Sequence, residues 1–471
     1  MRAALTIGIL VAVMLFVALV RDVDRDIFLE PLVNARTAST PAVKLTWDVD
    51  EFRAHTEGRQ GPYRSGDHLA YLTAARQLLE KRSVSTDFTA LWLPGVSVVA
   101  AGVIAVTGGA DYGLSMVVAT ALLMGLAMGL VVLATGVRGR NAIILGAGLV
   151  SLWLWPAGGD FLFGMGSLLS EGVSHSLLLM SVAGVIGVLR TGRLGWAVLS
   201  GGALGATALV RVFFAWVYPA TFVAVPAVAL LGIAVVSVRA RTLPDPRRGA
   251  LRVALLLLAA GITAHLVVQP WRNYKKHVLK QPGLVAMDTK YVWKWAFASD
   301  DQLPWYLKSG NAACHADPVL CREVQERWQT ISGDEVQALA LRTFLHHPFA
   351  WMAYKVRLLN WFWMGRSWSS LFGDAKVLLL EGLVQALLGL LGLCAVVYAC
   401  LWRGVREARW ALALLVALGG IYVGVFSLFQ YEWRYGLGLR MLCYYLPFLV
   451  WALRGHRRSE ADARIAGTTT A

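Results

Sequence analysis

Ten apolar runs are spread along this chain of 471 residues, and most are long enough to cross a lipid bilayer. A hydrocarbon core of about 30 Å is crossed by about 20 apolar residues in helical form. The sequence therefore predicts an all-α polytopic membrane protein with about 10 transmembrane helices. The runs cover residues 5–20, 113–135, 142–156, 172–190, 195–210, 213–238, 250–269, 376–401, 408–429 and 437–454.

The charge pattern indicates how these helices are oriented. A net charge of +15 with 44 Lys and Arg could suggest a nucleic-acid partner, but many of the Arg residues lie in short segments between apolar runs. Positive charge in that place marks the cytoplasmic side of a membrane. No nucleic acid is expected as a partner, and both termini are predicted to be cytoplasmic. The Arg-rich segments contain Arg138 and Arg140, Arg190 and Arg193, Arg239 to Arg252, Arg403 to Arg409, and Arg454 to Arg458.

This orientation places four polar segments outside a bacterial inner (plasma) membrane: 21–112, 157–171, 270–375 and 430–436. The first apolar run, 5–20, is interpreted as an uncleaved span, because no small-residue cleavage site precedes the charged residues that follow; a secretory signal is the alternative. The run from Leu91 to Val106 would invert the charge pattern if it crossed fully. It is therefore expected to dip into or lie along the outer leaflet, although a short span beside a misread neighbour would also restore the pattern.

Four regions follow from this pattern. They are a transmembrane module at 1–269 with a first periplasmic loop at 21–112, a periplasmic region with interfacial helices at 270–375, C-terminal transmembrane helices at 376–454, and a disordered cytoplasmic tail at 455–471. Cys314 and Cys321 lie in the longest polar segment and are expected to form a disulfide if it is exported. A metal pair with His315 is the alternative. Three further cysteines lie in apolar runs and are read as core residues: Cys394, Cys400 and Cys443.

Asp67 is the first candidate for a catalytic residue. It begins a helical pattern in a segment too polar to enter the bilayer, and an ionisable group beside a membrane often serves chemistry. Near a helix N-terminus the helix dipole favours its ionised form. A plain helix cap made by Ser65 or Asp67 explains the same pattern.

Other charged residues lie at predicted membrane boundaries. Glu171 and His175 are four residues apart on one helical face, so they could reach a common ligand or metal, or Glu171 could be a cap. Arg211 lies between two apolar runs, where an Arg is costly unless it meets an anion or reaches the interface. The stretch from Pro270 to Lys276 could hold a lipid phosphate or serve as an aromatic membrane anchor.

These stretches together resemble the GT-C superfamily of membrane glycosyltransferases, in particular bacterial relatives of protein O-mannosyltransferases and lipid A aminoarabinose transferases. The matching motifs occur in one order over residues 1–450. They are Gly66-Asp67 with Tyr71 and Ala75, Pro94-Gly95 to Gly108-Gly109, Ser170-Glu171, Leu209-Val210-Arg211, Pro270-Trp271-Arg272-Asn273-Tyr274, and Glu432-Trp433-Arg434-Tyr435.

The resemblance implies an enzyme that moves a sugar from a polyprenyl-phosphate donor to a periplasmic acceptor. By this resemblance Asp67 is the catalytic residue, which acts as general base or positions the acceptor nucleophile, since the acceptor hydroxyl must lose a proton as it attacks the sugar. Cations would offset the charge that develops on the lipid phosphate. The phosphate-binding candidates are Arg211, Arg272, Lys275 and Arg434, and the supporting candidates are His68, Tyr71, Glu171, Asn273, Glu432 and Tyr435.

The chain departs from better-known members in two ways. It has Asp67-His68 where many have Asp-Glu, which puts metal coordination by that pair in doubt, although a divalent metal remains a possible cofactor. No large soluble domain follows the last span, so acceptor recognition is expected from 270–375. That segment has many aromatic residues, and Trp351 to Trp368 are expected to form a membrane-interface belt.

Two other classes compete with this interpretation. An O-antigen-type polymerase or ligase would depend on Arg and His residues of its large outer loop, here His277, His315, His346 and His347. A transporter or flippase for lipid-linked sugars would concentrate polar residues near the bilayer midplane, where these spans have few charges.

Overall fold

The computed structural model describes a helical protein without strands over the residues it describes. These are residues 2–22, 66–84, 93–108, 112–154, 170–211, 213–239, 245–280, 294–297, 311–357, 387–395, 397–398, 410, 413–421 and 440–451. Four of their helices are long and apolar enough to cross a membrane, at Met116–Thr135, Ser170–Thr191, Phe214–Val235 and Gly249–Val278. The class of helical membrane protein is thereby supported. The number of about ten spans stays a prediction, although each of the ten apolar runs contains described helical residues.

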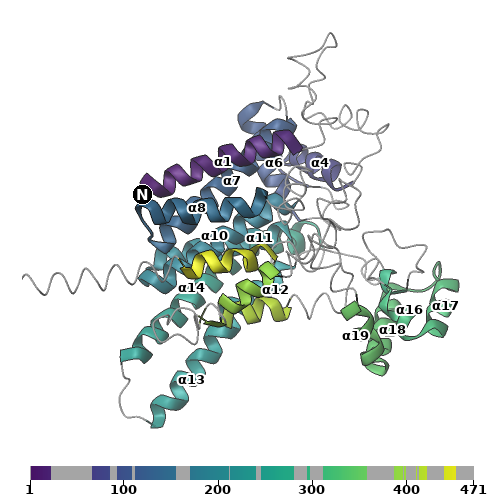
Figure 1. The fold of residues 1–471 in the computed structure, drawn as a ribbon. Helices are drawn as coiled ribbons and strands as arrows, with labels where there is room; N and C mark the ends of the chain where they lie inside the picture. Colours follow the sequence, from purple (N-terminus) through teal and green to yellow (C-terminus); the bar gives the residue numbers. More distant parts are fainter. Residues whose placement is uncertain are drawn as a thin grey trace, which may run out of the picture.

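The larger part of the described chain is a bundle of roughly parallel helix axes (Figure 1). Within it, α1 packs on α7, α7 on α10, α10 on α11, and α11 on α14, while α8 lies against α1. The bundle helices are α1 (Arg2–Asp22), α7 (Tyr112–Thr135), α8 (Gly139–Leu154), α10 (Ser170–Thr191), α11 (Leu194–Val210) and α14 (Asp245–Asn273). A rod on its flank consists of α12 (Phe214–Pro219), the π-helical η2 (Ala220–Ala224) and α13 (Val225–Arg239).

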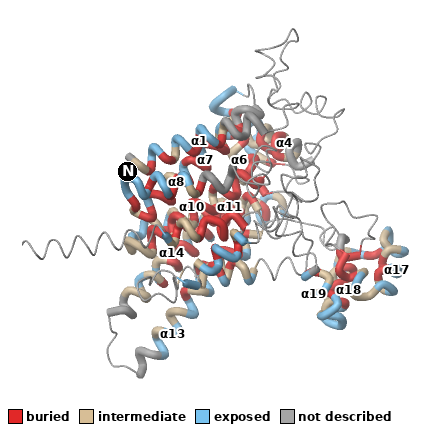
Figure 2. Tube along the Cα trace, in the orientation of Figure 1, coloured by how far each residue is buried: buried red, intermediate tan, exposed pale blue. Residues whose placement is uncertain are grey.

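Helix α10 is the central element of this bundle. In its candidate span, 78% of the most apolar stretch of 18 residues is buried inside the protein, whereas the corresponding share is 28% for the span formed by α12, η2 and α13. Figure 2 shows buried positions along α10 and α11 and many exposed positions on α1 and α13. The last described helix, residues 440–451, packs against both large hydrophobic clusters of the bundle, through Met441, Tyr444 and Tyr445 on one side and Leu442 and Cys443 on the other. Exposed apolar side chains on the outer helices are expected where a lipid bilayer surrounds a protein.

Small residues let the bundle helices come close together. A Cβ atom added to Gly125 of α7 would lie 2.4 Å from the carbonyl oxygen of Gly8 in α1. A Cβ atom added to Gly201 of α11 would lie 2.0 Å from the carbonyl oxygen of Ala260 in α14. In a lipid bilayer the hydrophobic effect does not drive apolar helices together, because lipid tails are as apolar as the side chains. Van der Waals contact between closely packed backbones must therefore hold such helices together.

Helices α4 (Gly66–Lys81) and α6 (Gly95–Thr107) lie at one end of the bundle, which we call the α4 end. Gly95 starts α6 against the last turn of α11, where an added Cβ would lie 2.7 Å from the carbonyl oxygen of Leu209. Gly108, in the left-handed conformation, ends α6 four positions before α7 begins at Tyr112. The other end of α7, at Gly136, lies beside Arg190 at the far end of the bundle, so the start of α7 lies at the α4 end. Both ends of α6 therefore lie at the α4 end. With 13 residues, and so about 20 Å, α6 is short for a full crossing. That it dips into or lies along the outer leaflet stays a prediction.

A second, smaller group of helices has its own hydrophobic core and lies apart from the bundle in Figure 1; we call it the disulfide module. Its helices pack around Phe297, Val324, Val336, Ala340 and Trp351. Two of its helices begin with side-chain caps, in which Asp317 accepts from Leu320 N–H at 3.0 Å and Ser332 accepts from Glu335 N–H at 3.2 Å. Its elements are η4 (Lys294–Phe297), α16 (Ala312–Ala316), α17 (Pro318–Glu326), α18 (Gly333–His346) and α19 (Pro348–Arg357).

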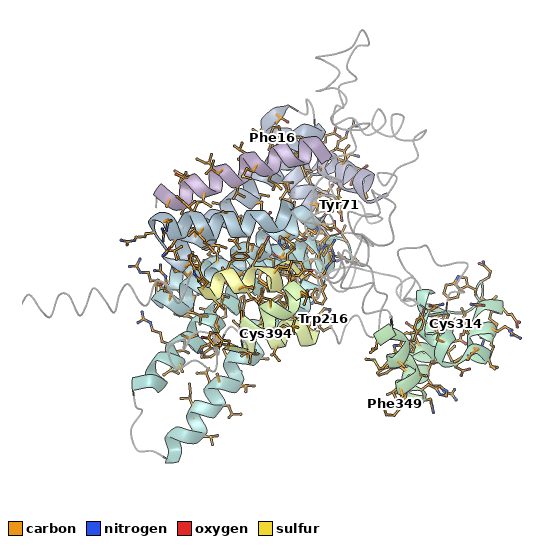
Figure 3. All side chains as sticks on the ribbon, in the orientation of Figure 1. Phe16, Tyr71, Trp216, Cys314, Phe349 and Cys394 are labelled. Carbon is orange, nitrogen blue, oxygen red and sulfur yellow. A yellow bond between two sulfur atoms is a disulfide. The ribbon has the colours of Figure 1, made fainter. Side chains whose placement is uncertain are left out.

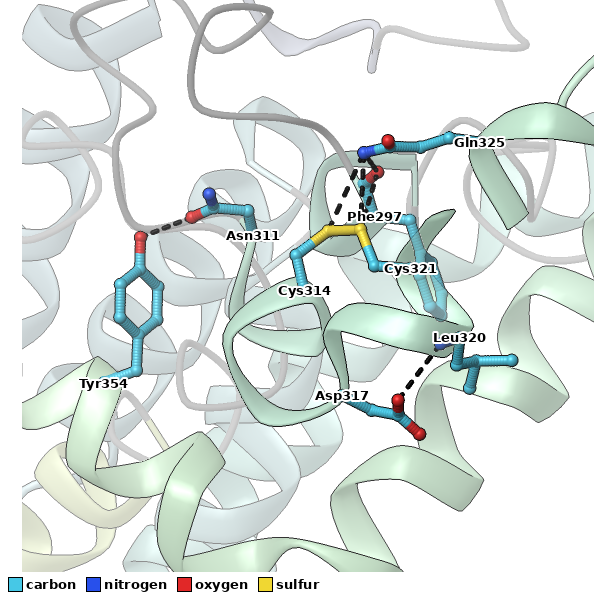
Figure 4. The surroundings of a disulfide bond; sticks show 8 residues. All are labelled: Phe297, Asn311, Cys314, Asp317, Leu320, Cys321, Gln325 and Tyr354. Atoms are coloured by element: carbon cyan, nitrogen blue, oxygen red, sulfur yellow. Dashed lines mark hydrogen bonds between the residues drawn. A yellow bond between two sulfur atoms is a disulfide. The ribbon is translucent and has the colours of Figure 1, made fainter. Parts of the chain in front are cut away.

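The predicted disulfide between Cys314 and Cys321 is confirmed and joins α16 to α17 (Figure 4). Beside it, Gln325 Nε2 donates a hydrogen bond to the carbonyl oxygen of Phe297 at 2.8 Å. The alternative of a metal pair with His315 is wrong, because both sulfur atoms are bonded to each other. His315 instead stacks on Tyr354 of α19, with ring centroids 3.8 Å apart.

The expected aromatic belt from Trp351 to Trp368 is wrong at its first residue. Trp351 is fully buried in the core of the disulfide module, where it meets Phe344 edge-on at 5.8 Å. An aromatic side chain suits a protein core as well as a membrane interface, so the sequence alone did not distinguish the two. The residues from 358 to 368 lie outside the described residues.

The close approach of α1 and α7 predicts that Gly125→Ala destabilises the protein. The new methyl group would lie 2.8 Å from the Cβ of Ala12 as well as against Gly8, so the helices must move apart, at a cost of about 1–3 kcal/mol. Thermal unfolding of the purified protein in detergent measures the change. Gly232→Ala in α13 is the control, since its added Cβ has no neighbour within 4 Å. Equal melting temperatures for the two variants would contradict the packing argument.

The buried Lys355 of the disulfide module predicts a pH dependence of stability. Burial lowers the pKa of Lys355 to about 7, from an ordinary value of 10.5, so the unfolded chain binds more protons above about pH 7. Stability of the module should therefore rise with pH through this range. Between about pH 6.5 and about pH 8.5 the gain is about 25-fold in the folding equilibrium, or about 2 kcal/mol.

Hydrogen exchange of the full chain checks this, using protection factors that correct for the intrinsic exchange rate at each pH. Amides of α18 and α19 should gain protection with pH in the wild type and not in Lys355→Met. A wild-type protection that is flat across the range would refute the prediction.

Candidate functional site

Helices carrying the predicted site residues meet at the α4 end. A compact cluster there contains Tyr71 of α4, Val96 of α6, Val173 of α10 and Val210 of α11. Trp271 of α14 and Tyr274 of the π-helical η3 (Tyr274–Val278) pack against it. Stretches that are far apart in the sequence, and that carry five of the six motifs, are thus brought to one place.

The aromatic residues after Pro270 hold this end together. Trp271 and Tyr274 stack with ring centroids 5.6 Å apart. The hydroxyl of Tyr274 accepts a hydrogen bond from the backbone N–H of Val84 at 3.4 Å, just beyond the end of α4. These two residues therefore bridge α14 to the segment that contains Asp67.

Glu171 and Arg211, expected as separate members of a site, are partners in an ion pair. Arg211 also donates from Nε to the hydroxyl of Ser170 at 3.0 Å. The side chain of Glu171 is 1% exposed and that of Arg211 is 15% exposed, so the charges are largely removed from water. Arg211 takes an extended conformation directly after α11, which brings its guanidinium back to the first turn of α10. A charge pair with this little exposure depends strongly on both partners.

The alternative of a metal pair formed by Glu171 and His175 finds no support. The carboxylate of Glu171 meets a guanidinium, and the ring of His175 lies 6.1 Å from that of Tyr445. Over the described ranges no group of three or more His, Cys, Asp or Glu side chains could hold a metal ion.

The basic stretch after Pro270 divides between two environments. Arg272 and Asn273 are exposed, and the amide of Asn273 accepts from Gln269 Nε2 at 3.0 Å. Lys275 is fully buried within η3. Arg272 and Lys275 therefore differ in exposure, and their role as phosphate-binding residues stays a prediction. A π-helical turn holds more residues than an α-helical turn, and this rotates Lys275 relative to its helical neighbours.

Two sets of predicted residues are placed in part or not at all. Asp67 and His68 are the second and third residues of α4, so Asp67 lies within the first turn. The structure does not describe the side chains of these two residues. Glu432, Arg434 and Tyr435 lie outside the described residues altogether.

Arg440 is a candidate that the sequence interpretation missed. Its side chain is almost fully buried, as are those of Tyr444 and Tyr445 one turn further on. The contact of Tyr445 with His175 places this helix beside α10. If both helices run in the direction that the charge pattern predicts, Arg440 lies about 8 Å before Tyr445 and Glu171 about 6 Å before His175, at nearly the same depth. The signal was available, since Arg440 is the one charged residue in the apolar run 437–453.

Comparison with known proteins gives no relative for this chain. No family model matches it, no curated protein matches it, and no solved structure matches it.

The pair of Glu171 and Arg211 predicts a large coupling energy. Arg211→Met or Glu171→Leu alone leaves a charge with little exposure unpaired and should cost about 3–5 kcal/mol, while the double variant should cost clearly less than the sum. Titration with a denaturing detergent measures the three free energies of unfolding.

The exposed pair of Arg76 and Glu80, 2.7 Å apart and four residues apart in α4, is a matched control. Its double-mutant cycle should give less than about 1 kcal/mol. Additive effects at Glu171 and Arg211 would show that the two side chains are not energetically coupled.

Proposed function

We propose that this chain is a membrane glycosyltransferase of GT-C type, which moves a sugar from a polyprenyl-phosphate donor to a periplasmic acceptor at the α4 end. One observation carries the proposal. Helices holding five separated motifs of the GT-C pattern meet around a single cluster, and charged groups with little exposure lie beside it. Such groups at one end of a membrane bundle are costly and are kept where they serve a function.

In this proposal Asp67 takes the proton of the acceptor hydroxyl. Its position in the first turn of α4 suits this role in one respect, because the helix dipole keeps a carboxylate ionised there and therefore able to accept a proton. Proton transfer to a positioned carboxylate contributes roughly 10²–10⁴-fold to a rate. Tyr71, one turn further, packs in the cluster and fixes the α4 helix against α6 and α10.

Cationic side chains stabilise the lipid phosphate as it leaves. A guanidinium has five N–H donors, so Arg211 can contact Ser170, Glu171 and a phosphate oxygen together. Glu171 then fixes the direction of the guanidinium, which favours the transition state because no reorganisation is needed at the moment of reaction. Among the described residues of the bundle, Lys275 and Arg440 are the further buried cations, and Arg272 and Arg434 stay predictions.

Three observations bear on the competing classes. The disulfide supports an oxidising compartment for the segment 270–375, as an active site on the periplasmic side requires. His315, a candidate of the polymerase or ligase class, is exposed and stacks on Tyr354 within the disulfide module. For a transporter, buried charges would be expected near the middle of the spans, whereas Glu171 lies in the first turn of α10.

Asp67→Asn in native membranes tests the proposal. With a labelled polyprenyl-phosphate sugar and native acceptor, transfer should fall by about 10²-fold or more. Asp67→Glu should retain part of the activity, since it keeps a carboxylate. Asp334→Asn, at an exposed carboxylate of the disulfide module, is the control and should transfer at the wild-type rate.

Full transfer by Asp67→Asn would remove the central claim. If His346→Ala or His347→Ala abolished activity while Asp67→Asn did not, the polymerase or ligase class would replace the transferase class. A divalent metal stays a prediction, and the same assay with a chelator tests it.

A further inference from the structure

The disulfide module has an apolar surface that nothing in the described structure covers. Phe349 is 89% exposed and Leu345 is 74% exposed, and Ala353 and Val356 are also exposed. We call these four residues the α19 ridge. Phe349, Ala353 and Val356 are four and three residues apart, so they share one face of α19, and Trp351 and Lys355 fill the core from the other. Figure 3 shows Phe349 at the edge of the module.

The carboxylates of the module are confined to one stretch of the chain. All five carboxylates of residues 311–357 lie between 317 and 335: Asp317, Glu323, Glu326, Asp334 and Glu335. The residues from 336 to 357 include no Asp or Glu, and they include Arg342, His346, His347 and Arg357, which lie next to the ridge residues in the sequence. The ridge therefore lies in a part of the chain that has arginine residues and no carboxylate, which suits an anionic partner with an apolar interior.

The position of the ridge in the chain points to what that partner is. Arg357 at the end of α19 is followed by Trp361, Phe362 and Trp363, and the next apolar run begins at residue 376. Aromatic residues of this kind concentrate at the boundary between membrane and water. In Figure 1, α19 lies on the side of the module that faces the bundle and α17 on the far side. The segment that follows α19 in the sequence thus leads toward the membrane, so the bilayer around the bundle is the surface that the ridge would meet.

We propose that the α19 ridge docks the disulfide module onto the bilayer in which the bundle is embedded. Phe349, Leu345 and Val356 enter the boundary between headgroups and acyl chains, and Arg342 with His346 and His347 lies at the lipid phosphates. A helix with an apolar face and basic neighbours binds a membrane surface in this way, by apolar burial together with attraction to anionic lipids. This fixes the orientation of the module, with α19 toward the membrane and α17 away from it. The inference does not depend on the proposed transferase activity.

Photo-crosslinking of the full-length protein in nanodiscs tests the docking. The nanodiscs contain one copy of the chain and a mixture of phosphatidylethanolamine and phosphatidylglycerol. Phe349→p-benzoylphenylalanine keeps the aromatic ring and adds a photoreactive ketone. Val319→p-benzoylphenylalanine is the matched control, since Val319 is 80% exposed on α17 and lies outside the ridge. Mass spectrometry measures the fraction of protein that has gained the mass of one lipid.

The proposal expects at least about tenfold more lipid adduct at position 349 than at position 319. It also expects a severalfold loss of adduct when Leu345→Ser and Val356→Ser are added, or when phosphatidylglycerol is omitted. Equal adduct at the two positions would overturn the proposal. Crosslinking of position 349 to a second copy in nanodiscs that hold two chains, with no lipid adduct in nanodiscs that hold one, would overturn it in favour of self-association.

Discussion

The cost of removing charge from water organises this protein more than any other single term. An unpaired carboxylate or guanidinium within a bundle of apolar helices would cost several kcal/mol, so Glu171 and Arg211 can occur there only as partners. Their pairing ties the first turn of α10 to the end of α11, and it does so at the α4 end. The helices that carry the other motifs pack around this tie, through Tyr71, Val96, Val173 and Val210. A structural requirement and a candidate chemical site therefore coincide.

Close helix packing is what brings these groups into register. Small residues at Gly125, Gly184, Gly201 and Gly205 allow backbone contact between neighbouring helices. Because contact between backbones leaves little room for helices to slide or rotate, the ends of α10, α11 and α14 meet at one level. The same packing leaves α10 enclosed on nearly all sides, which explains why Glu171 and His175 are buried although they lie near the end of a helix.

The sequence predicted features of this fold that depend on local information. Apolar runs gave the helices of the bundle to within a few residues, because length and hydrophobicity are read along the chain. The disulfide was predictable because Cys314 and Cys321 are close in sequence and lie in a polar segment. The pairing of Glu171 with Arg211 was not, since 40 residues separate them and either could have met a ligand. Arg272 is exposed and Lys275 is buried because of the π-helical turn of η3, and the sequence pattern does not predict a π-helical turn. The catalytic assignment of Asp67 remains a prediction from resemblance.

The ion pair also limits how the proposed reaction can use its cations. Arg211 is neutralised in part by Glu171, so it contributes direction more than net positive charge to a phosphate. The net charge that offsets a leaving lipid phosphate must then come from other cations, and Lys275 and Arg440 are the buried ones among the described residues of the bundle. An Arg211 held by Glu171 is a fixed donor, whereas a lysine acts as a point charge on a longer stem. Arg211 therefore orients the phosphate, and the other cations supply the positive charge that stabilises it. Loss of Glu171 would then act mainly by changing the orientation in which Arg211 holds the donor phosphate.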